Sequence, residues 1–329
     1  MKQKTIYLFI FLILFFSACQ SPSISVEEQT PSKSLYIPDF DADSAYSFVH
    51  NQVDFGPRVP NTKAHADCGV YLTSTLQRFA DTLLLQEYRV KAYDGTMLHG
   101  KNIIGVFNPS QKVRVLLAAH WDSRPYADHD PDPENRRKPI DGANDGASGV
   151  GVLLEIARQL QLKRPDIGVD IILFDVEDYG APQDSEASYS GEFWCLGSQY
   201  WAKNQHIRNY SARYGILLDM VGGENAVFTH EGTSLYYAPD ILSHVWSIAE
   251  QLGYGSNFRR IETPPITDDH LYVNQIARIP MIDIIEYNNT TSTGFNQYWH
   301  TLNDNMSNID KNTLQKVGKV VLATLYHEE

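Results

Sequence analysis

Cysteine is scarce in this sequence, which contains only 3 Cys among its 329 residues. Cys19 follows an apolar N-terminal stretch, so Cys68 and Cys195 are the two that remain for the rest of the chain. No CxxC pair or neighbouring histidine completes a cysteine-based zinc set around either of them. The two could pair in an oxidising compartment, but they lie far apart and their spacing does not decide the question.

Basic residues are also few: 27 Lys and Arg stand against 40 Asp and Glu, for a net charge of −13. Binding to nucleic-acid phosphates needs a basic face, so a nucleic-acid partner is not expected. The one short basic cluster, Arg136-Arg137-Lys138, is flanked by acids and prolines. This setting predicts a solvated loop.

The N-terminus carries an apolar stretch, Ile6 to Phe16, which is too short to span a bilayer. Lys2 and Lys4 precede it, and Ser17-Ala18-Cys19 follows it. This arrangement resembles a bacterial lipoprotein signal, and the resemblance implies lipidation of Cys19. The alternative is ordinary secretion with cleavage near Ala18. Either way the mature protein leaves the cytoplasm, and a lipid on Cys19 would anchor it in the cell envelope, facing the periplasm.

The pattern divides the chain into a signal segment (1–19), a flexible tether (20–35) and one folded domain (36–329). The tether is rich in Ser, Pro, Glu and Gln, which is typical of segments that bury no core. In the domain, apolar spacing predicts helices and strands in alternation. The expected helices are 43–52, 62–79, 148–162, 197–204, 241–252 and 311–325, and the expected strands are 102–107, 113–119, 169–174, 214–220 and 281–285.

Near-continuous apolar strands that alternate with helices predict a sheet that is covered on both faces. We therefore expect a single α/β domain with a twisted, mixed and mostly parallel central sheet. In such sheets the binding site lies beyond the carboxyl ends of the strands. Six side chains that suit a metal stand at or near strand ends in this sequence: His120, Asp145, Glu177, Asp178, Asp219 and His300.

These residues point to metal chemistry as a set. A lone histidine after a strand is usually a core residue, but a carboxylate two positions on, as in Asp122, can orient the ring of His120. Asp145 lies in a glycine-rich turn that also reads as a helix start. Glu177 and Asp178 would repel each other at the end of a buried strand unless a cation neutralised them. Two histidines and three carboxylates suit zinc.

A second acidic pattern, Asp128-x-Asp130-x-Asp132, does not predict a calcium loop. Pro133 follows it where the turn of an EF-hand needs glycine. We expect a charged, proline-rich surface loop there instead.

The six residues together resemble the zinc aminopeptidase superfamily, the peptidase M28 clan. The closer resemblance is to the animal-type glutaminyl cyclases, over roughly Tyr36 to the C-terminus. It rests on Trp194, on Cys195-Leu196-Gly197-Ser198, on Asp268-Asp269-His270 and on Trp299 before the last histidine. Two positions depart from the pattern: the adjacent acids are Glu-Asp rather than Glu-Glu, and Asp283 stands where animal cyclases carry a histidine.

The resemblance implies a zinc-aminopeptidase-like fold and one zinc per chain. It assigns Asp145, Asp178 and His300 as zinc ligands and Glu177 as the acid/base. It places Asp219 and Asp268 in a carboxylate network beside Glu177, and Trp194 and Trp299 in the walls of the pocket. His120 would be the remnant of a second metal position.

The implied activity is cyclisation of an N-terminal glutamine to pyroglutamate with release of ammonia, by a monomeric enzyme that acts on peptides or proteins. The alternative is an aminopeptidase in which His120 and Asp219 hold a second zinc. A third reading, a lipoprotein that binds peptides without turnover, leaves Glu177 unexplained.

Overall fold

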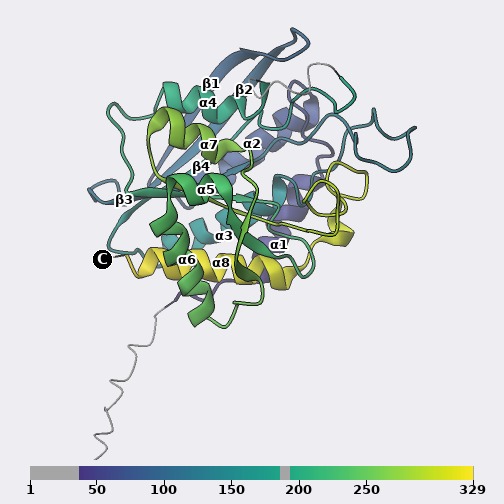
Figure 1. The fold of residues 1–329 in the computed structure, drawn as a ribbon. Helices are drawn as coiled ribbons and strands as arrows, with labels where there is room; N and C mark the ends of the chain where they lie inside the picture. Colours follow the sequence, from purple (N-terminus) through teal and green to yellow (C-terminus); the bar gives the residue numbers. More distant parts are fainter. Residues whose placement is uncertain (1–36, 186–192, 329) are drawn as a thin grey trace, which may run out of the picture. The chain divides into compact units, whose positions relative to one another are not determined.

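A mixed sheet of six strands runs through the middle of the fold (Figure 1). The structure, a computed structural model, describes residues 37–185 and 193–328, and these belong to one compact unit. The expected signal segment with Cys19 and the expected tether lie outside the described residues. Within the described ranges, none of the helices combines the length and the apolar character needed to span a bilayer.

Helices and strands alternate along most of the chain, as the sequence predicts. Their bounds are α1 Ala42–Val53, α2 Lys63–Gln77, β1 Thr82–Lys91, β2 Met97–Phe107, β3 Arg114–His120, α3 Ala147–Leu162, β4 Gly168–Phe174, α4 Leu196–Lys203, β5 Tyr214–Asp219, β6 Phe228–Glu231, α5 Gly232–Tyr237, α6 Pro239–Gln251, β7 Phe258–Thr263, α7 Asp269–Tyr272, η3 Val273–Ala277, β8 Met281–Ile285, η4 Met306–Asn308 and α8 Lys311–Tyr326.

The strand order in the sheet is β1-β2-β4-β3-β5-β8. β4, β3, β5 and β8 run parallel to one another. β1 and β2 form an antiparallel hairpin, and β2 pairs with β4 antiparallel. The prediction of a mixed, mostly parallel sheet is therefore confirmed. The chain leaves β3 to one side for β4 and then crosses to the other side for β5, which makes β3 the switch point of the sheet.

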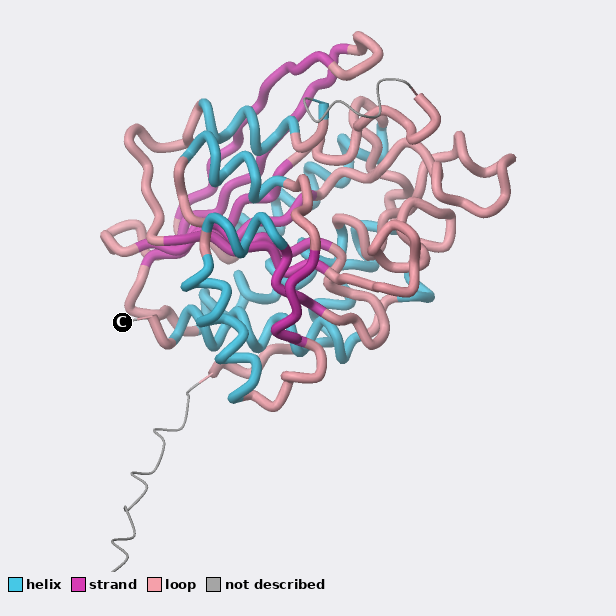
Figure 2. The backbone as a smooth tube through the Cα atoms, in the orientation of Figure 1, coloured by secondary structure: helices cyan, strands magenta, loops and turns pink. Residues whose placement is uncertain are grey.

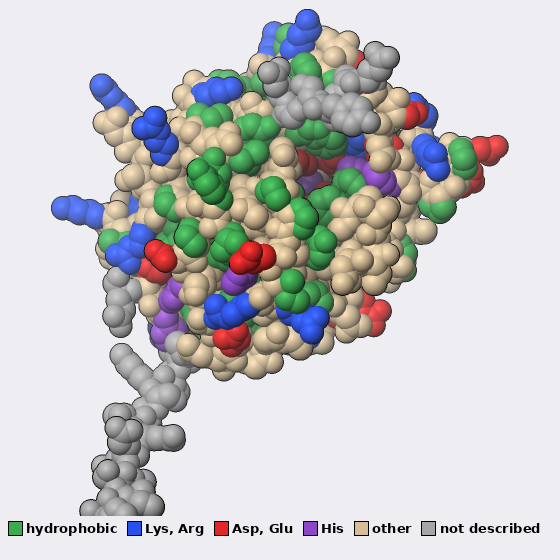
Figure 3. Space-filling view, in the orientation of Figure 1, with side chains coloured by type: hydrophobic (Ala, Val, Ile, Leu, Met, Phe, Trp, Pro, Cys, Tyr) green, Lys and Arg blue, Asp and Glu red, His purple; other side chains and the backbone are tan. Residues whose placement is uncertain are grey.

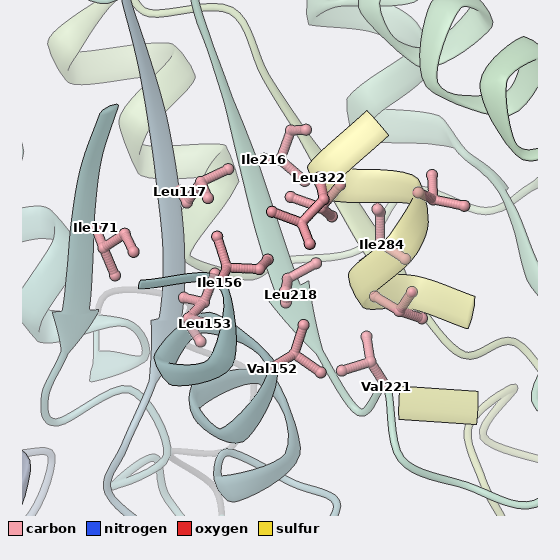
Figure 4. Packing of buried hydrophobic residues seen from close by; sticks show 14 of the residues in the cluster. Leu117, Val152, Leu153, Ile156, Ile171, Ile216, Leu218, Val221, Ile284 and Leu322 are labelled. Carbon is pink, nitrogen blue, oxygen red and sulfur yellow. The ribbon is translucent and has the colours of Figure 1, made fainter. Parts of the chain in front are cut away.

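Both faces of the sheet are covered by helices, and Figure 2 shows the strands between them. Alternate residues of each strand point to opposite faces. Leu117 of β3 joins the larger core with α1, α2, α3, α6 and α8, while its neighbour Leu116 packs with α4 and η3 on the other face. Figure 4 shows part of the larger core, where Leu153 and Ile156 of α3 lie against the strands.

Three of the longer helices begin with a side-chain cap. Asp41, Thr62 and Asp310 accept backbone N–H groups at the first turns of α1, α2 and α8. The sequence did not predict β1, whose residues are mostly exposed or half-buried on an edge, nor the short strands β6 and β7. Edge and short strands bury too little apolar surface to leave a clear periodic pattern.

Candidate functional site

The carboxyl ends of three neighbouring strands deliver the expected residues to one place. His120 is the last residue of β3, and Asp219 is the last residue of β5. Glu177 and Asp178 follow the end of β4, which lies on the other side of β3. Asp145 stands just before α3, the helix that follows β3. The strand-end argument made from the sequence is confirmed by this arrangement.

Gly146 lets the turn before α3 approach the sheet closely. Its φ is +92°, a conformation that glycine adopts without steric cost. A Cβ at this position would lie 2.8 Å from the carbonyl oxygen of Asp122 and 2.9 Å from Cε1 of His120. The glycine therefore brings Asp145 next to the end of β3.

Asp145, Asp178 and His300 form one group that can hold a metal ion. One ligand atom of each lies within 4.8 Å of the others, and all three residues are buried. The Nε2 atom of His300 is 3.5 Å from Asp145 Oδ2 and 3.4 Å from Asp178 Oδ1. Asp145 Oδ2 and Asp178 Oδ2 are buried without a hydrogen-bond partner. Two carboxylates and an imidazole with unpartnered oxygens suit a zinc ion, which would neutralise the buried charges.

A second group shares Asp145 and adds His120 and Asp219. Here the acceptors have a partner, because His120 Nε2 lies 3.0 Å from Asp145 Oδ1 and 3.2 Å from Asp219 Oδ1. Burial lowers the pKa of His120, but the contacts with Asp122, Asp145 and Asp219 outweigh burial and raise the pKa well above its ordinary value.

Arg124 and Asp128 contact Asp178 and His300 of the first group, and neither role was predicted from the sequence. Arg124 is 1% exposed and donates to both carboxylate oxygens of Asp128, at 2.9 and 2.6 Å. It also donates to Asp178 Oδ1 at 3.3 Å. Asp128 Oδ1 lies 3.3 Å from Nδ1 of His300. Such a carboxylate fixes the ring orientation of a ligating histidine.

Burial opposes ionisation of Asp128, yet the hydrogen bond from Arg124 and the neighbouring His300 hold the pKa of this carboxyl well below its usual range. The prediction of a surface loop was wrong for Asp128 and Asp130, because these residues are only 9% and 3% exposed. It was right for Asp132 and the basic cluster 136–138, which are exposed. Arg124 is only four positions from Asp128, but the other partners, His300 and the N–H of Gln183, come from loops distant in sequence.

Glu177 is a partly buried acid that lines the same cavity as Asp145, Asp178 and His300. Burial raises its pKa well above the ordinary value, and the charges of Asp178 and Asp268 add to the effect against the opposing influence of His120. Burial likewise raises the pKa of Asp219 to about 7. Acids with raised pKa values can accept and return a proton near neutral pH.

Asp268 and Asp283 extend this acidic cluster. Asp268 caps α7, and one of its oxygens, Oδ2, is buried without a hydrogen-bond partner. Asp283, on β8, is fully buried, and its pKa is raised well above the ordinary value by burial and then by the charge of Asp268. Glu177, Cys195 and Asp268 form a further group whose ligand atoms lie within 4.8 Å of one another.

The backbone at the site is strained in four places. Nine non-glycine residues of the described chain have positive φ, and four of the five that are not asparagine lie at the site: Val176, Cys195, Met220 and His300. Such residues cost roughly 1–3 kcal/mol each and persist only where the surrounding structure holds them. They stand directly before Glu177, beside its side chain, directly after Asp219 and at the metal-type histidine.

A cavity of about 330 Å³ opens above these residues. Glu177 and Asp268 line it together with Asp145, Asp178 and His300, and Trp194 and Trp299 form part of its walls. The Trp299 ring stacks on His300 with centroids 3.7 Å apart, and the guanidinium of Arg124 lies 4.7 Å from the Trp194 ring centroid. Figure 3 shows a hollow on this face of the molecule in which acidic and histidine side chains gather.

A larger cavity, of about 720 Å³, lies between α2 and the β1–β2 hairpin. Its buried histidine, His65, is 2.8 Å from Asp175, and its walls include Trp121. None of the metal-type groups found in the described residues lines this cavity. Size therefore does not identify the functional site, whereas the chemistry of the lining does.

The two remaining cysteines are free thiols, so the pairing that the spacing left open does not occur. Cys68 is buried on α2, and Cys195 is buried just before α4. The Sγ atom of Cys195 donates to Glu177 Oε1 at 3.2 Å. This contact is a site feature that the sequence did not reveal.

Comparison with known proteins places this site in a family. Residues 102–325 match the family described as Peptidase family M28. The chain belongs to this family. This M28 chain is similar to the solved glutaminyl cyclase of Bacteroides thetaiotaomicron bound to N-acetylhistamine: the two are 55% identical with a TM-score of 0.88, over 89% of this chain and 100% of that one.

Two further relatives show the range of activities ascribed to similar M28 chains. A solved Zn-dependent exopeptidase from Parabacteroides distasonis is 57% identical, with a TM-score of 0.87 over 89% of this chain and 100% of that one. The glutaminyl-peptide cyclotransferase of Boiga irregularis is 27% identical over 250 residues, which is 67% of this chain. This M28 chain spans just under two thirds, 63%, of that relative's length.

Proposed function

We propose that the protein cyclises the N-terminal glutamine of peptides and proteins to pyroglutamate and releases ammonia. The observation that carries the proposal is the position of Glu177, a partly buried acid beside the Asp145, Asp178 and His300 group in a cavity walled by two tryptophans. The similarity to solved and curated glutaminyl cyclases supports it.

We assign one zinc ion to Asp145, Asp178 and His300, because their unpartnered buried oxygens call for a cation. Bound there, zinc would supply Lewis-acid polarisation of the γ-amide carbonyl of the substrate. The shorter Asp178, in place of a second glutamate, is held by Arg124, which sets the direction of its carboxylate.

Glu177 carries the proton in this scheme. The neutral α-amine of the substrate forms a bond to the γ-carbonyl carbon, the bond from that carbon to the amide nitrogen breaks, and a five-membered lactam closes. Glu177 accepts the proton that the α-amine loses and gives it to the departing nitrogen, which leaves as ammonia. Because nucleophile and electrophile belong to one residue, the protein contributes mainly orientation and electrostatics.

The neighbouring groups prepare Glu177 and the substrate. The charges of Asp178 and Asp268 favour the protonated form of Glu177 once it has taken the proton, and we assign Asp219, whose pKa is raised to about 7, to the same carboxylate network. Trp299 and Trp194 give the cavity apolar walls, which hold the substrate and keep water out of the reaction.

An aminopeptidase is the second candidate. It is favoured by the group of His120, Asp145 and Asp219, which has the composition of a second metal position, and by the similarity to a Zn-dependent exopeptidase. Two ligands of one zinc ion also lie about as far apart as His120 Nε2 and Asp219 Oδ1 do here, 3.2 Å, so this contact fits both functions. Zinc stoichiometry therefore separates the two functions.

The deciding experiment is mass spectrometry of a short glutamine-initiated peptide mixed with the purified enzyme. Loss of the mass of one ammonia from an otherwise intact peptide is the result that we expect. Release of free glutamine, with the peptide shortened by one residue, would show an aminopeptidase instead.

Glu177→Gln tests the assigned role of this residue. The amide has the same shape but cannot accept the proton, so turnover should fall about 10²–10⁴-fold while the protein folds and keeps its zinc. The measurement is kcat together with zinc content. Near-normal turnover would remove Glu177 from the proton transfer.

We further propose that the protein is a monomer anchored to the cell envelope by a lipid on Cys19. Lys2, Lys4, the apolar segment 6–16 and the small residues before Cys19 support this placement. Metabolic labelling with a fatty acid should mark the wild type and not Cys19→Ser, and fractionation should find the variant released from membranes. Light scattering of the chain from Leu35 onward tests the oligomeric state.

A further inference from the structure

Cys195 contacts Glu177 through both its backbone and its side chain. Its backbone N–H donates to the carbonyl oxygen of Glu177 at 2.9 Å, and its thiol donates to Glu177 Oε1 at 3.2 Å. The next residue repeats the backbone contact, because the N–H of Leu196 donates to the carbonyl oxygen of Val176 at 2.9 Å. The start of α4 is thereby fixed to the segment that follows β4.

The hydrogen bond from the Cys195 thiol is the one that reaches the side chain of Glu177. Among the hydrogen bonds of residues 37–185 and 193–328, no other reaches a side-chain oxygen of Glu177. The other oxygen, Oε2, lies 3.9 Å from Nδ1 of His120, which is beyond hydrogen-bond range. Within the described ranges, the thiol of Cys195 is therefore the hydrogen-bond donor to the Glu177 carboxylate.

The backbone at Cys195 is unusual for a cysteine. Its φ and ψ are 54° and 38°, the left-handed conformation in which glycine or asparagine is usual. Two residues on, a Cβ at Gly197 would lie 2.1 Å from the carbonyl oxygen of Asp175, so the first turn of α4 is pressed against the end of β4. A cysteine that is kept in a strained backbone conformation indicates that its side chain has a function that glycine could not provide.

The surroundings keep the thiol in its donor form. Cys195 is fully buried, and burial, followed by the nearby charge of Glu177, raises the pKa of its thiol well above the ordinary value. The group therefore remains a neutral S–H beside the acid. A thiol is a weak donor, so it can orient a carboxylate without competing strongly for the proton that the carboxylate exchanges.

We propose that Cys195 is a positioning residue, whose thiol fixes the orientation of the Glu177 carboxylate for proton transfer. The inference rests on the proposed function, in which Glu177 carries the proton. The competing explanation is that Cys195 is only a small side chain that fills space at the start of α4.

Four variants separate these explanations. Cys195→Ala removes the thiol and keeps the left-handed strain, Cys195→Gly removes both, and Cys195→Ser keeps a donor. Cys68→Ala is the control, since Cys68 is the other buried free thiol of the described chain and lies on α2. Each is measured for kcat, KM and zinc content.

The expected result is a fall in kcat of about tenfold for Cys195→Ala and Cys195→Gly, with KM changed by less than about twofold. Cys195→Ser should retain kcat within about threefold, and Cys68→Ala should match the wild type. Zinc content should stay the same throughout. Unchanged kcat in Cys195→Ala, or recovery of kcat in Cys195→Gly, would overturn the proposal in favour of a space-filling role.

A double-mutant cycle links the effect to Glu177. In a Glu177→Gln background, Cys195→Ala should cause no further loss, because the group that the thiol positions no longer transfers a proton. An equal loss in both backgrounds would contradict the proposal.

Failure of this proposal can be distinguished from failure of the proposed function. The kcat of each variant is divided by the kcat of the wild type for whichever product the wild type forms, cyclised or shortened peptide. A wild type that forms neither product refutes the proposed function. In that case a crystal structure of Cys195→Ala still decides: the Glu177 carboxylate should turn from its wild-type orientation, and an unmoved carboxylate would refute the positioning role.

Discussion

Two histidine–tryptophan stacks lie in different cavities of this protein. In the site cavity, His300 stacks on Trp299 with centroids 3.7 Å apart and planes at 23°. In the larger cavity beside α2, His65 stacks on Trp121 at 4.3 Å and 12°. Each histidine is buried and has a carboxylate partner, Asp128 for His300 and Asp175 for His65.

The two stacks differ in whether the carboxylate oxygens near the histidine have hydrogen-bond partners. Asp175 is fully engaged: Oδ1 accepts from His65 and from the N–H of Val176, and Oδ2 accepts from the N–H of Lys101. Around His300, by contrast, Asp145 and Asp178 each keep a buried oxygen without a partner. A buried histidine stacked on a tryptophan is therefore structural when its acids are satisfied, and it marks a ligand site when they are not.

The largest contrast is expected from replacing the two histidines. His300→Ala should remove zinc and lower kcat/KM by at least about a thousandfold, because a ligand is lost. His65→Ala should keep zinc and kcat but lower the free energy of unfolding by about 1–3 kcal/mol, since Asp175 loses its partner. Zinc content, kinetics and urea unfolding measure these effects. Zinc loss in His65→Ala would abolish the distinction.

The acid partners should show a smaller version of the same contrast. Asp128→Asn leaves Arg124 without its charge partner and loosens the ring of His300, so zinc affinity should fall about 10–100-fold. Asp175→Asn should leave zinc affinity unchanged and lower stability instead. Competition with a chelator measures the affinity of both variants, and equal affinities would show that Asp128 does not act through His300.

Replacing the two tryptophans should have the next largest effect. Trp299→Phe should raise KM about three- to tenfold with little change in stability, because part of the cavity wall is lost. Trp121→Phe removes the indole N–H that donates to the carbonyl oxygen of Lys101 at 3.1 Å, and should cost about 1–2 kcal/mol of stability without changing KM. A rise in KM for Trp121→Phe would place substrate in the larger cavity.

The smallest effect concerns pH. Burial opposes the charge on His65, but the charge of Asp175 outweighs it and raises the pKa of His65 above its ordinary 6.5. The folded protein thus binds this proton more tightly than the unfolded chain does. The resulting stabilisation is complete below the ordinary pKa and is lost as pH rises through the higher folded value.

Urea unfolding of the wild type and His65→Gln across this pH window tests the claim. The difference in unfolding free energy between the two proteins should shrink as pH rises. A difference that grows with pH would mean that His65 is neutral in the folded protein.

Much of the site was readable from the sequence because its residues end apolar strands. His120, Glu177, Asp178 and Asp219 each follow a buried run, and the parallel arrangement of those runs brings their ends together. His300 lies in a loop between β8 and α8, outside this strand-end logic. Only its motif, shared with relatives, pointed to it.

The rest depended on contacts between distant loops. Arg124 reaches Asp178 across 54 positions, and Cys195 reaches Glu177 across 18. No local periodicity records such pairs, so Cys195 was left with no role beyond the motif, and Asp128, which contacts His300 across 172 positions as well as the nearby Arg124, was predicted to be exposed. The edge strand β1 was missed for a related reason, because its exposed residues obey no burial pattern.

The left-handed residues around the site bear on how this protein can evolve. Glycine at Val176 or Met220 would relieve backbone strain of roughly 1–3 kcal/mol, but both side chains are buried, and deleting one the size of Met220 costs about 2–5 kcal/mol. The packing of the two side chains therefore opposes replacement by glycine. Selection for heat resistance at these positions thus also preserves the conformation of the segments that present Glu177 and Asp219.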